Sequence, residues 1–454
     1  MKKKLSCREY VYIASMLFGM FFGAGNLIFP VFMGQMAGNH VWTASVGFLI
    51  TGVGLPLLGV AALGISRSEG LYDLSSKVSR PYAMFFTCLL YLTIGPFFAI
   101  PRCATTSFTV GLEQMLPEND HVWVYLLVFT FVFFVAALLF SLYPGKIMTW
   151  IGKILNPCFL VFLGVLVITA LTHPAAGISE VAPVGKYAKT AFFTGFLEGY
   201  NTMDALAALA FGIVVVRVIR GLGVSDSKAV AGNTVRSGIF SCLLMALIYL
   251  AVTIVGTQSR GFLAQPCENG GEALSLIAQH YFGGAGLWIM AITVTLACMK
   301  TAVGLITSCA ETFESIFPKG PSYRVWAIIF SVVSFLFANL GLSTIIEYSV
   351  PVLMFLYPLA ITLVLLALFG GLFGHDRAVY VSVTALTLPA ALFDLLSALP
   401  KTVQNTLHLT GILDVIGDFL PFSTIGLGWI APAMLGLIIG LTVHFARRSS
   451  RSLA

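Results

Sequence analysis

The residues best suited to chemistry lie where glycine, asparagine and carboxylates interrupt two long apolar stretches. The first interruption is the sequence FGAGN at 22–26, and the second is TGFLEGYNTMD at 194–204. Glycine costs ~1 kcal/mol relative to alanine inside a helix. A backbone that unwinds at bilayer depth is tolerated only where protein or a water-filled cavity satisfies its polar groups. The pattern therefore predicts two broken helices that line a site for a small solute.

The backbone groups freed at these breaks could bind the charged groups of a small solute. The half-helix that begins near Asn26 would present free N–H groups and a positive dipole end to a carboxylate. Carbonyl groups released near Phe22, Gly23 and 197–199 would accept from an ammonium group. The apolar surroundings favour an apolar substrate side chain. The candidate substrate-binding residues are Phe22, Gly23, Ala24, Gly25, Asn26, Leu197, Gly199, Tyr200, Thr202 and Asp204.

Several of these residues have more than one interpretation. Asn26 would either coordinate a cation or hold the unwound loop. Asp204 would be a proton acceptor, a cation ligand, a hydrogen-bond anchor or a structural carboxylate satisfied by its neighbours. Glu198 would belong to the site or to a solvated vestibule, and the glycines at 194–204 would alternatively serve close helix packing. Three ionisable residues near the outer ends of their spans are expected to reach water rather than form gates: Arg102, Glu347 and Asp394.

Composition shows what surrounds these stretches. Of 454 residues, 58% are hydrophobic and 10% are charged, with a mean hydropathy of +0.95. Soluble domains carry about 25% charged residues, so lipid must be the main solvent of this chain. About twelve segments reach the ~20 residues that a membrane helix needs. They are 10–33, 42–65, 82–112, 122–142, 147–171, 190–216, 237–257, 286–312, 323–342, 344–370, 378–399 and 422–446.

The arrangement of these segments predicts one transmembrane domain, 1–454, with internal repeats. The two broken helices are the first and the sixth, so they cross the membrane in opposite directions. This is the mark of an inverted 5+5 repeat, here 10–171 and 190–370, with two extra helices at 378–446. Segment 258–285 is expected to be a long outer loop.

The distribution of charge predicts the orientation. Nineteen of the 25 basic residues fall in predicted inner segments and four in outer ones, while Arg102 and Lys300 lie within spans. This bias places both termini in the cytoplasm. The positive net charge of +6 then reflects anchoring to the lipid bilayer, and no basic patch interleaved with aromatic residues suggests a nucleic-acid partner.

Other classes of function find little support. No nucleotide-binding motif occurs, so neither ATP hydrolysis nor an ATPase partner is expected. The seven histidines and eight cysteines have no metal-site spacing, so we expect no enzyme, no cofactor and no metal beyond a possible Na⁺. A channel would need a continuous polar pore, whereas the polar breaks are isolated.

Six motifs in order resemble the bacterial branched-chain amino-acid:cation symporter family, also called branched-chain amino acid transport system II carriers. They are FGAGNLIFP (22–30), IGPFFAIPR (94–102), SLYPGK (141–146), GYNTMDAL (199–206), TAVGLITSCAETF (301–313) and NLGLSTIIEYSVPVL (339–353). The resemblance implies an all-α LeuT-type fold in the bacterial cytoplasmic (inner) membrane. It also implies uptake of leucine, isoleucine and valine by symport with Na⁺ or H⁺ as coupling ion. Methionine is a further candidate, because single methylenes are weakly discriminated.

The same resemblance implies a site for the coupling cation. In LeuT-type carriers, carbonyls of the first helix and oxygen-bearing residues of the eighth bind Na⁺. The corresponding residues here are Gly19, Phe22, Ala297, Lys300 and Thr301. Lys300 departs from this pattern, because an ammonium group replaces an oxygen ligand. Either Lys300 itself occupies the cation position, which would make a Na⁺-independent carrier or exchanger, or it faces another cavity or pairs with a carboxylate.

Overall fold

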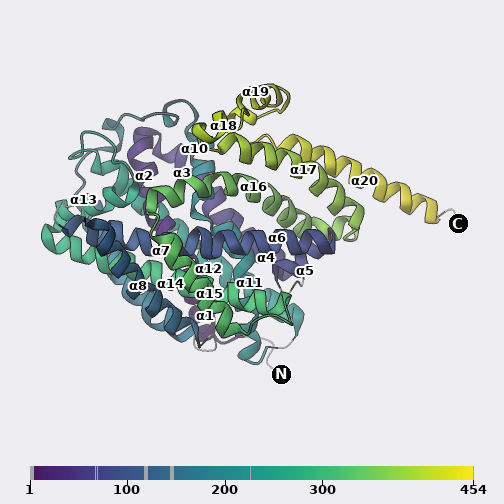
Figure 1. Cartoon of the computed structure of the whole chain (residues 1–454), viewed down its shortest axis with the longest axis horizontal. Coiled ribbons are helices and arrows are strands. Elements are labelled where there is room, and N and C mark those ends of the chain that lie inside the picture. The colour runs from purple at the N-terminus through teal and green to yellow at the C-terminus, as the bar shows by residue number, and fades with distance from the viewer. Residues whose placement is uncertain are drawn as a thin grey trace.

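The protein is described here by a computed structural model that covers residues 5–66, 68, 70–116, 121–143, 148–224 and 226–452. Within these ranges the regular structure is entirely helical. The helices form one bundle, from which the pair α17 and α20 extends toward the C-terminus (Figure 1). Five basic residues used to predict orientation lie outside the described residues: Lys2, Lys3, Lys4, Arg67 and Lys146.

The first predicted half begins with a helix in two pieces. The elements of this half are α1 (Cys7–Phe21), α2 (Ala24–Ala37), α3 (Val41–Leu49), η2 (Ile50–Gly54), α4 (Leu55–Ile65), α5 (Leu71–Ser76), α6 (Arg80–Leu92), η3 (Thr93–Phe97), α7 (Ala99–Ser107), η4 (Phe108–Leu112), α8 (Val122–Ser141), η7 (Met148–Leu155) and α9 (Asn156–Thr172). Short 3₁₀ turns at Gly38–His40 and Glu113–Met115 complete it.

The second predicted half likewise begins with a divided helix. Its elements are α10 (Tyr187–Glu198), η9 (Gly199–Thr202), α11 (Asp204–Gly221), α12 (Ser227–Ser259), α13 (Gly270–Phe282), α14 (Gly284–Ile316), α15 (Tyr323–Ala338) and α16 (Leu342–Phe369). Beyond it lie α17 (Arg377–Ala398), α18 (Lys401–Thr406), α19 (Thr410–Phe419) and α20 (Ile430–Ser452). The remaining 3₁₀ turns are Ile178–Glu180, Gly370–Phe373 and Ser423–Ile425.

Ten helical runs in the described residues are long and apolar enough to cross a membrane. One run, Gly25–Ile65, covers parts of two predicted spans, and α15, at 16 residues, is a shorter apolar helix. Each of the twelve predicted ranges contains helix. The prediction of an all-α membrane protein with broken first and sixth helices is confirmed, whereas the inverted repeat stays a prediction.

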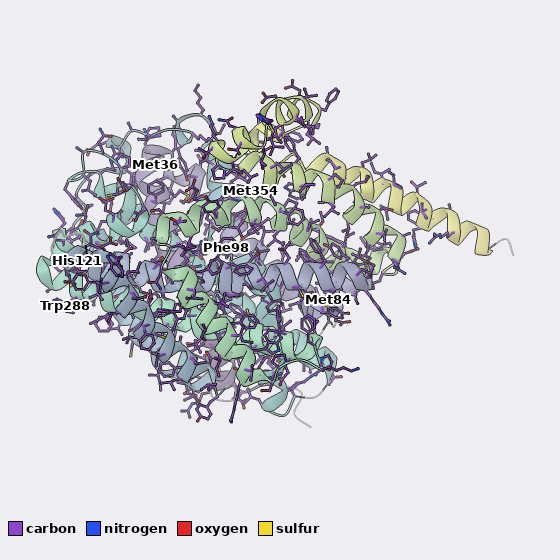
Figure 2. The ribbon with its side chains drawn as sticks, in the orientation of Figure 1. Met36, Met84, Phe98, His121, Trp288 and Met354 are labelled. Carbon is purple, nitrogen blue, oxygen red and sulfur yellow. The ribbon has the colours of Figure 1, made fainter. Side chains whose placement is uncertain are left out.

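The outer surface of the bundle is apolar. Phe131 on α8, Val161 on α9 and Leu243 on α12 are exposed, as is Trp288, which lies at the edge of the molecule in Figure 2. Large apolar side chains on this scale are stable only against another apolar phase. The chain is therefore a multi-pass membrane protein.

For the third predicted span, 82–112, the sequence allows either a tilted helix or a shorter helix followed by a surface helix. The span consists of α6 and α7 joined by the π-helical turn η3, in which the backbone of Gly95 is not helical (φ −88°, ψ −123°). Pro96 follows and lacks an N–H group, so the regular hydrogen-bond ladder stops here. Phe98, labelled in Figure 2, comes directly after the kink. The span is therefore a third interrupted helix.

The segments between spans are also more ordered than expected. The predicted outer loop 258–285 contains α13, whose Gly270 packs so closely on α2 that a β-carbon would lie 1.8 Å from the Ile28 carbonyl oxygen. Segment 401–425 forms α18, α19 and a 3₁₀ turn at the end of the bundle near α10 (Figure 1). The two breaks are thus enclosed by packed helices.

Candidate functional site

The first break lies between α1 and α2. The backbone of Phe22 and Gly23 is extended, with φ of −75° and −119°. The amide N–H of Gly23 donates to Asn26 Oδ1 at 2.8 Å. A β-carbon on Gly23 would lie 2.6 Å from Thr301 Oγ1, so only glycine fits against α14 at this point. The first break is fixed by its own asparagine and by close contact with α14.

The second break lies between α10 and α11. After Glu198 the chain forms the 3₁₀ turn η9, and Met203 then adopts a left-handed conformation with φ of +63° before Asp204 begins α11. The hydroxyl of Thr202 donates to the carbonyl of Gly199 at 2.9 Å. A left-handed conformation is unusual for a side chain of this size. The strained turn directs Asp204 toward the first break.

A buried hydrogen-bond network joins the two breaks. Asn26 Nδ2 donates to Asp204 Oδ2 at 2.6 Å, and the hydroxyl of Tyr249 on α12 donates to the same oxygen at 2.7 Å. Asn26 Nδ2 also contacts the Tyr249 hydroxyl. Of the interpretations left open by the sequence, the geometry supports the loop anchor for Asn26 and the hydrogen-bond anchor for Asp204. Sequence reasoning missed Tyr249, which looked like an ordinary aromatic residue in an apolar span.

A small cavity lies at this network. Six of the predicted residues line it: Gly23, Gly25, Asn26, Thr202, Asp204 and Thr301. Its apolar wall includes Met20, Phe21, Ile94, Ala99 and Leu305. The cavity has a volume of only about 20 Å³, so the surrounding helices must separate before a solute larger than water can enter.

Arg102 also lines this cavity, contrary to the expectation that it reaches water. Its side chain is 3% exposed. Nη1 donates to the carbonyl oxygen of Asn201 at 2.9 Å, and the guanidinium carbon lies 5.4 Å from the centre of the Phe29 ring. The kink at Gly95 explains the error, because it separates α7 from α6 and makes position along a straight span a poor guide to depth.

Four predicted substrate-binding residues lie outside the cavity lining, namely Phe22, Leu197, Gly199 and Tyr200. Phe22 packs in an aromatic cluster with Phe18, Phe159 and Tyr249. Gly199 packs on α3 and η2, where a β-carbon would lie 2.0 Å from Thr51 Oγ1, so close helix packing explains this glycine. Leu197 lines a second, wider cavity, and Tyr200 is buried against Tyr357. Ala24 begins α2, and its side chain lies outside the described part of the chain.

The predicted cation-site residues divide into two groups. Lys300 is fully buried, and its Nζ donates to Asn156 Oδ1 on α9 at 3.0 Å. The same Nζ lies 3.7 Å from the centre of the Phe159 ring and 5.5 Å from that of Phe18. A β-carbon on Gly19 would lie 3.6 Å from Lys300 Cδ. Lys300 and Gly19 therefore contact each other, whereas Thr301 contacts Gly23 and lines the central cavity. Ala297 is buried one turn earlier on α14.

The pairing of Lys300 with a carboxylate is not seen in the described part of the chain, where its polar partner is an amide oxygen. Asn156 also donates from Nδ2 to Ser15 Oγ at 2.8 Å. The ammonium group thus lies in a pocket made by α1, α9 and α14. The signal for Asn156 was present, since an Asn-Pro pair interrupts an apolar span, but sequence reasoning missed it. Among the described residues no histidine, cysteine and carboxylate cluster suited to a metal ion occurs.

A wide cavity of about 960 Å³ opens beyond the second break, lined by parts of α10, α16, α17 and α19. Glu198, Leu197 and Met354 line it, and Figure 2 labels Met354 near the centre of the molecule. Glu198 therefore fits the vestibule interpretation. Asp394 also lines this cavity but is only 6% exposed, which corrects its expected interfacial position; Glu347 is exposed as expected.

The floor of the wide cavity lies close to the central one. Asn201 lines the wide cavity, and its carbonyl accepts the hydrogen bond from Arg102, which lines the central cavity. Tyr200 is buried beside it and stacks on Tyr357 of α16 with ring centres 4.0 Å apart. A single turn of backbone and one aromatic pair therefore separate the two cavities.

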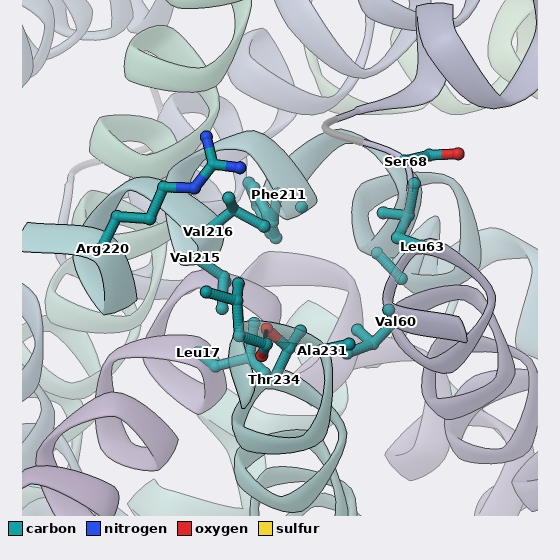
Figure 3. A pocket seen from close by; sticks show the side chains of 14 residues that line it. Leu17, Val60, Leu63, Ser68, Phe211, Val215, Val216, Arg220, Ala231 and Thr234 are labelled. Carbon is teal, nitrogen blue, oxygen red and sulfur yellow. Dashed lines mark hydrogen bonds between the residues drawn. The ribbon is translucent and has the colours of Figure 1, made fainter. Parts of the chain in front are cut away.

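A third cavity lies among α1, α4, α11 and α12 (Figure 3). Its lining is mainly apolar, including Leu17, Val60 and Phe211, with Arg220 at one side. It contains none of the predicted site residues. We interpret it as a gap between the helices that carry the two breaks.

Comparison with known proteins agrees with the motifs. The sequence profile of the branched-chain amino acid transport protein family matches residues 6–447. The chain belongs to this family. It is 53% identical to the branched-chain amino acid permease BrnQ of Lactobacillus delbrueckii subsp. lactis, over 95% of this chain and 96% of the relative. It is 39% identical to the branched-chain amino acid transport system 2 carrier protein of Pseudomonas aeruginosa, over 95% of each chain. The expectation of a transport protein rather than an enzyme is confirmed.

Solved structures support the fold of this family member. The inward-facing conformation of the transporter Mhp1 matches with a TM-score of 0.60 at 13% identity, covering 96% of this chain and 91% of Mhp1. MhsT in complex with L-phenylalanine matches with a TM-score of 0.56 at 16% identity, covering 98% and 99%. At this level of identity the similarity shows the LeuT-type fold alone.

Proposed function

We propose that this protein imports leucine, isoleucine and valine by cation symport, with methionine as a further candidate substrate. The observation that carries the proposal is the cavity at which the two helix breaks meet. It brings Asp204 and Arg102 together with an apolar wall and the start of α2, where the first N–H groups of a helix have no partner within the helix. These are complementary to the carboxylate, ammonium and aliphatic side chain of a neutral amino acid. The names of the relatives given above support the same substrate class.

Transport proceeds by alternating access around this cavity. The narrow central cavity and the wide one beyond it are separated by η9 and the stacked rings of Tyr200 and Tyr357. Movement of these groups would open the site to one side, and movement along the gap between α1 and α11 would open it to the other. Inverted-repeat transporters commonly bind substrate at such a midplane site.

The protein resides in the bacterial cytoplasmic membrane with both termini in the cytoplasm. The bias of basic residues toward predicted inner segments supports this orientation, and the bacterial relatives support the membrane. Cysteine-accessibility labelling in intact cells tests it. Residues near Lys319 should be protected, and residues near Lys401 should react.

A second candidate for coupling rests on Lys300. In this alternative its ammonium group stands permanently where a carrier of this fold would bind Na⁺, so transport is Na⁺-independent and works by exchange or with H⁺. The supporting observation is its burial beside Gly19 with an amide and two aromatic rings as neighbours. An ammonium group can replace a bound cation because both interact favourably with oxygen atoms and ring faces.

The decisive experiment is uptake of radiolabelled leucine into proteoliposomes under separately imposed gradients. A Na⁺ gradient, a proton gradient and a membrane potential are applied one at a time, with choline replacing Na⁺ where needed. Accumulation above equilibrium under a Na⁺ gradient supports Na⁺ symport, and accumulation under a proton gradient supports H⁺ symport. Leucine counterflow without either gradient supports exchange. Failure of isoleucine and valine to compete with leucine would refute the substrate assignment.

A further inference from the structure

Arg102 is held rigidly between the elements that carry both breaks. On one side its Nη1 donates to the carbonyl of Asn201 in η9 at 2.9 Å. On the other side its guanidinium group lies over the ring of Phe29 in α2. The side chain belongs to α7, immediately beyond the kink of the third span. Three interrupted helices therefore converge on one buried cation.

The guanidinium group of Arg102 has unused hydrogen-bond donors. It offers five N–H groups, yet its one hydrogen bond in the described residues is that from Nη1 to Asn201. Nε is buried and has no hydrogen-bond partner among the residues that the structure describes. Nη2 lies next to Gly25, where a β-carbon would be 2.9 Å away. The Nε–Nη2 edge is the edge through which arginine binds a carboxylate with two parallel hydrogen bonds.

Two neighbouring features point to the same ligand. The first turn of α2 begins beside Nη2, so the free N–H groups of a helix start lie near the guanidinium edge. Thr301 Oγ1, which lines the same cavity, is also buried and has no hydrogen-bond partner in the described part of the chain. A buried charge and a buried hydroxyl left unpaired are unfavourable. An anionic group entering this cavity would satisfy them.

We propose that Arg102 binds the carboxylate of the transported amino acid through Nε and Nη2, together with the first N–H groups of α2. This inference rests on the proposed function and assigns one substrate group to one side chain. Asp204 lines the same cavity and supplies the negative charge toward which the substrate ammonium group turns. The cavity therefore selects a zwitterion over an amine, an amide or a free carboxylic acid of the same carbon skeleton.

Competitive binding to purified protein tests this role. Radiolabelled leucine is displaced by unlabelled leucine and by leucinamide, which keeps the ammonium group and side chain but has no carboxylate. We expect the wild type to prefer leucine at least about tenfold, because bonds between charged groups are strong. Arg102→Gln should lower that preference at least about tenfold, because it weakens the binding of leucine and leaves the binding of leucinamide nearly unchanged.

Two further variants make the test decisive. Arg102→Lys keeps the charge but loses the two-pronged geometry, so an intermediate preference is expected; it also serves if Arg102→Gln fails to fold. Arg324→Gln removes an exposed arginine at the start of α15 and should keep the wild-type preference. A wild-type preference in Arg102→Gln, or in Arg102→Lys where the glutamine variant is not recovered, would overturn the proposal. Absence of leucine binding in the wild type would instead refute the proposed function.

Discussion

Two buried cations lie in the membrane interior of this protein, and their surroundings differ. Arg102 on α7 and Lys300 on α14 are 3% and 0% exposed, and neither is in an ion pair with a carboxylate within the ranges that the structure describes. Arg102 lines a cavity, and its Nε has no hydrogen-bond partner among the described residues. Lys300 is enclosed by Asn156, Phe159 and Phe18.

This difference separates two uses of a buried positive charge. A cation enclosed by an amide oxygen and aromatic ring faces is part of the protein framework, and its loss changes how the helices fit together. A cation with free donors facing a cavity binds something that arrives and leaves. Variants of Lys300 should therefore change the rate and coupling of transport, whereas variants of Arg102 should change affinity for substrate.

The largest expected effect is at Lys300. Lys300→Ala and Lys300→Met should each lower leucine uptake at least about a hundredfold, because Asn156 Oδ1 loses a charged partner in a buried site. Methionine nearly preserves the volume of the lysine stem, so equal loss in both variants assigns the effect to the charge. The measurement is initial leucine uptake in proteoliposomes at a clamped membrane potential, with and without Na⁺.

Lys300→Thr provides the complementary test of coupling. It returns an oxygen ligand to α14, so we expect Na⁺-stimulated uptake in this variant and Na⁺-independent uptake in the wild type if the ammonium group replaces the bound ion. Strict Na⁺ dependence of the wild type would refute this role. More than a tenth of normal uptake in Lys300→Met would show that packing rather than charge is what Lys300 contributes.

Asp204 should show the next largest effect, because it lies in the cavity of Arg102 and apart from Lys300. In Asp204→Asn the side chain no longer provides a charged acceptor for Asn26 and Tyr249, and we expect about a thirtyfold loss of leucine binding. Tyr249→Phe removes one of the two bonds and should cost about fivefold. Equilibrium binding of radiolabelled leucine measures both. A stronger effect of Tyr249→Phe would contradict the assigned network.

The sequence predicts the two breaks well because their cause is local. Glycine and asparagine at 22–26 and at 199–204 disfavour a continuous helix whatever surrounds them. The third break has an equally local cause in Gly95 and Pro96, which was overlooked because the whole stretch 82–112 is apolar. Its consequence was missed as well, since the depth of Arg102 depends on the kink.

The sequence predicts less well which way a residue faces. Lys300 and Thr301 are neighbours in α14, yet adjacent residues in a helix point about 100° apart. One therefore contacts Gly19 and the other Gly23. Gly199 illustrates the same limit, because only the contact with Thr51 shows that it serves packing. These assignments depend on tertiary contacts that a helical pattern does not contain.

Asn156 tests how far the pocket of Lys300 depends on its acceptor. Asn156→Ala removes the amide that accepts from Nζ and donates to Ser15. We expect about a tenfold lower rate of leucine uptake, since the aromatic rings still stabilise the ammonium group. Ser15→Ala, which removes only the second bond, is the matched control and should cost much less. An equal loss of uptake in Asn156→Ala and Ser15→Ala would show that Asn156 acts mainly by holding α9 against α1.

The smallest expected effects come from two glycines, one beside each cation. A β-carbon on Gly25 would lie 2.9 Å from Arg102 Nη2, and one on Gly19 would lie 2.6 Å from Ile151 Cγ2 and 3.6 Å from Lys300 Cδ. Gly25→Ala should push the flexible guanidinium end aside and raise the KM for leucine about threefold, while the maximal rate is nearly kept. Gly19→Ala should disturb the framework instead and lower the maximal rate about threefold, with KM nearly unchanged.

Leucine uptake measured over a range of leucine concentrations, with the protein in one orientation, separates KM from the maximal rate. Thermal stability of each purified variant is measured alongside, because Ile151 is short and branched and yields less readily than an arginine end. If Gly25→Ala and Gly19→Ala change KM by similar factors, the two cations act on one binding step. The distinction between a ligand-binding charge and a framework charge is then wrong. If the effects divide as expected, the charge at Arg102 governs recognition and the charge at Lys300 governs turnover.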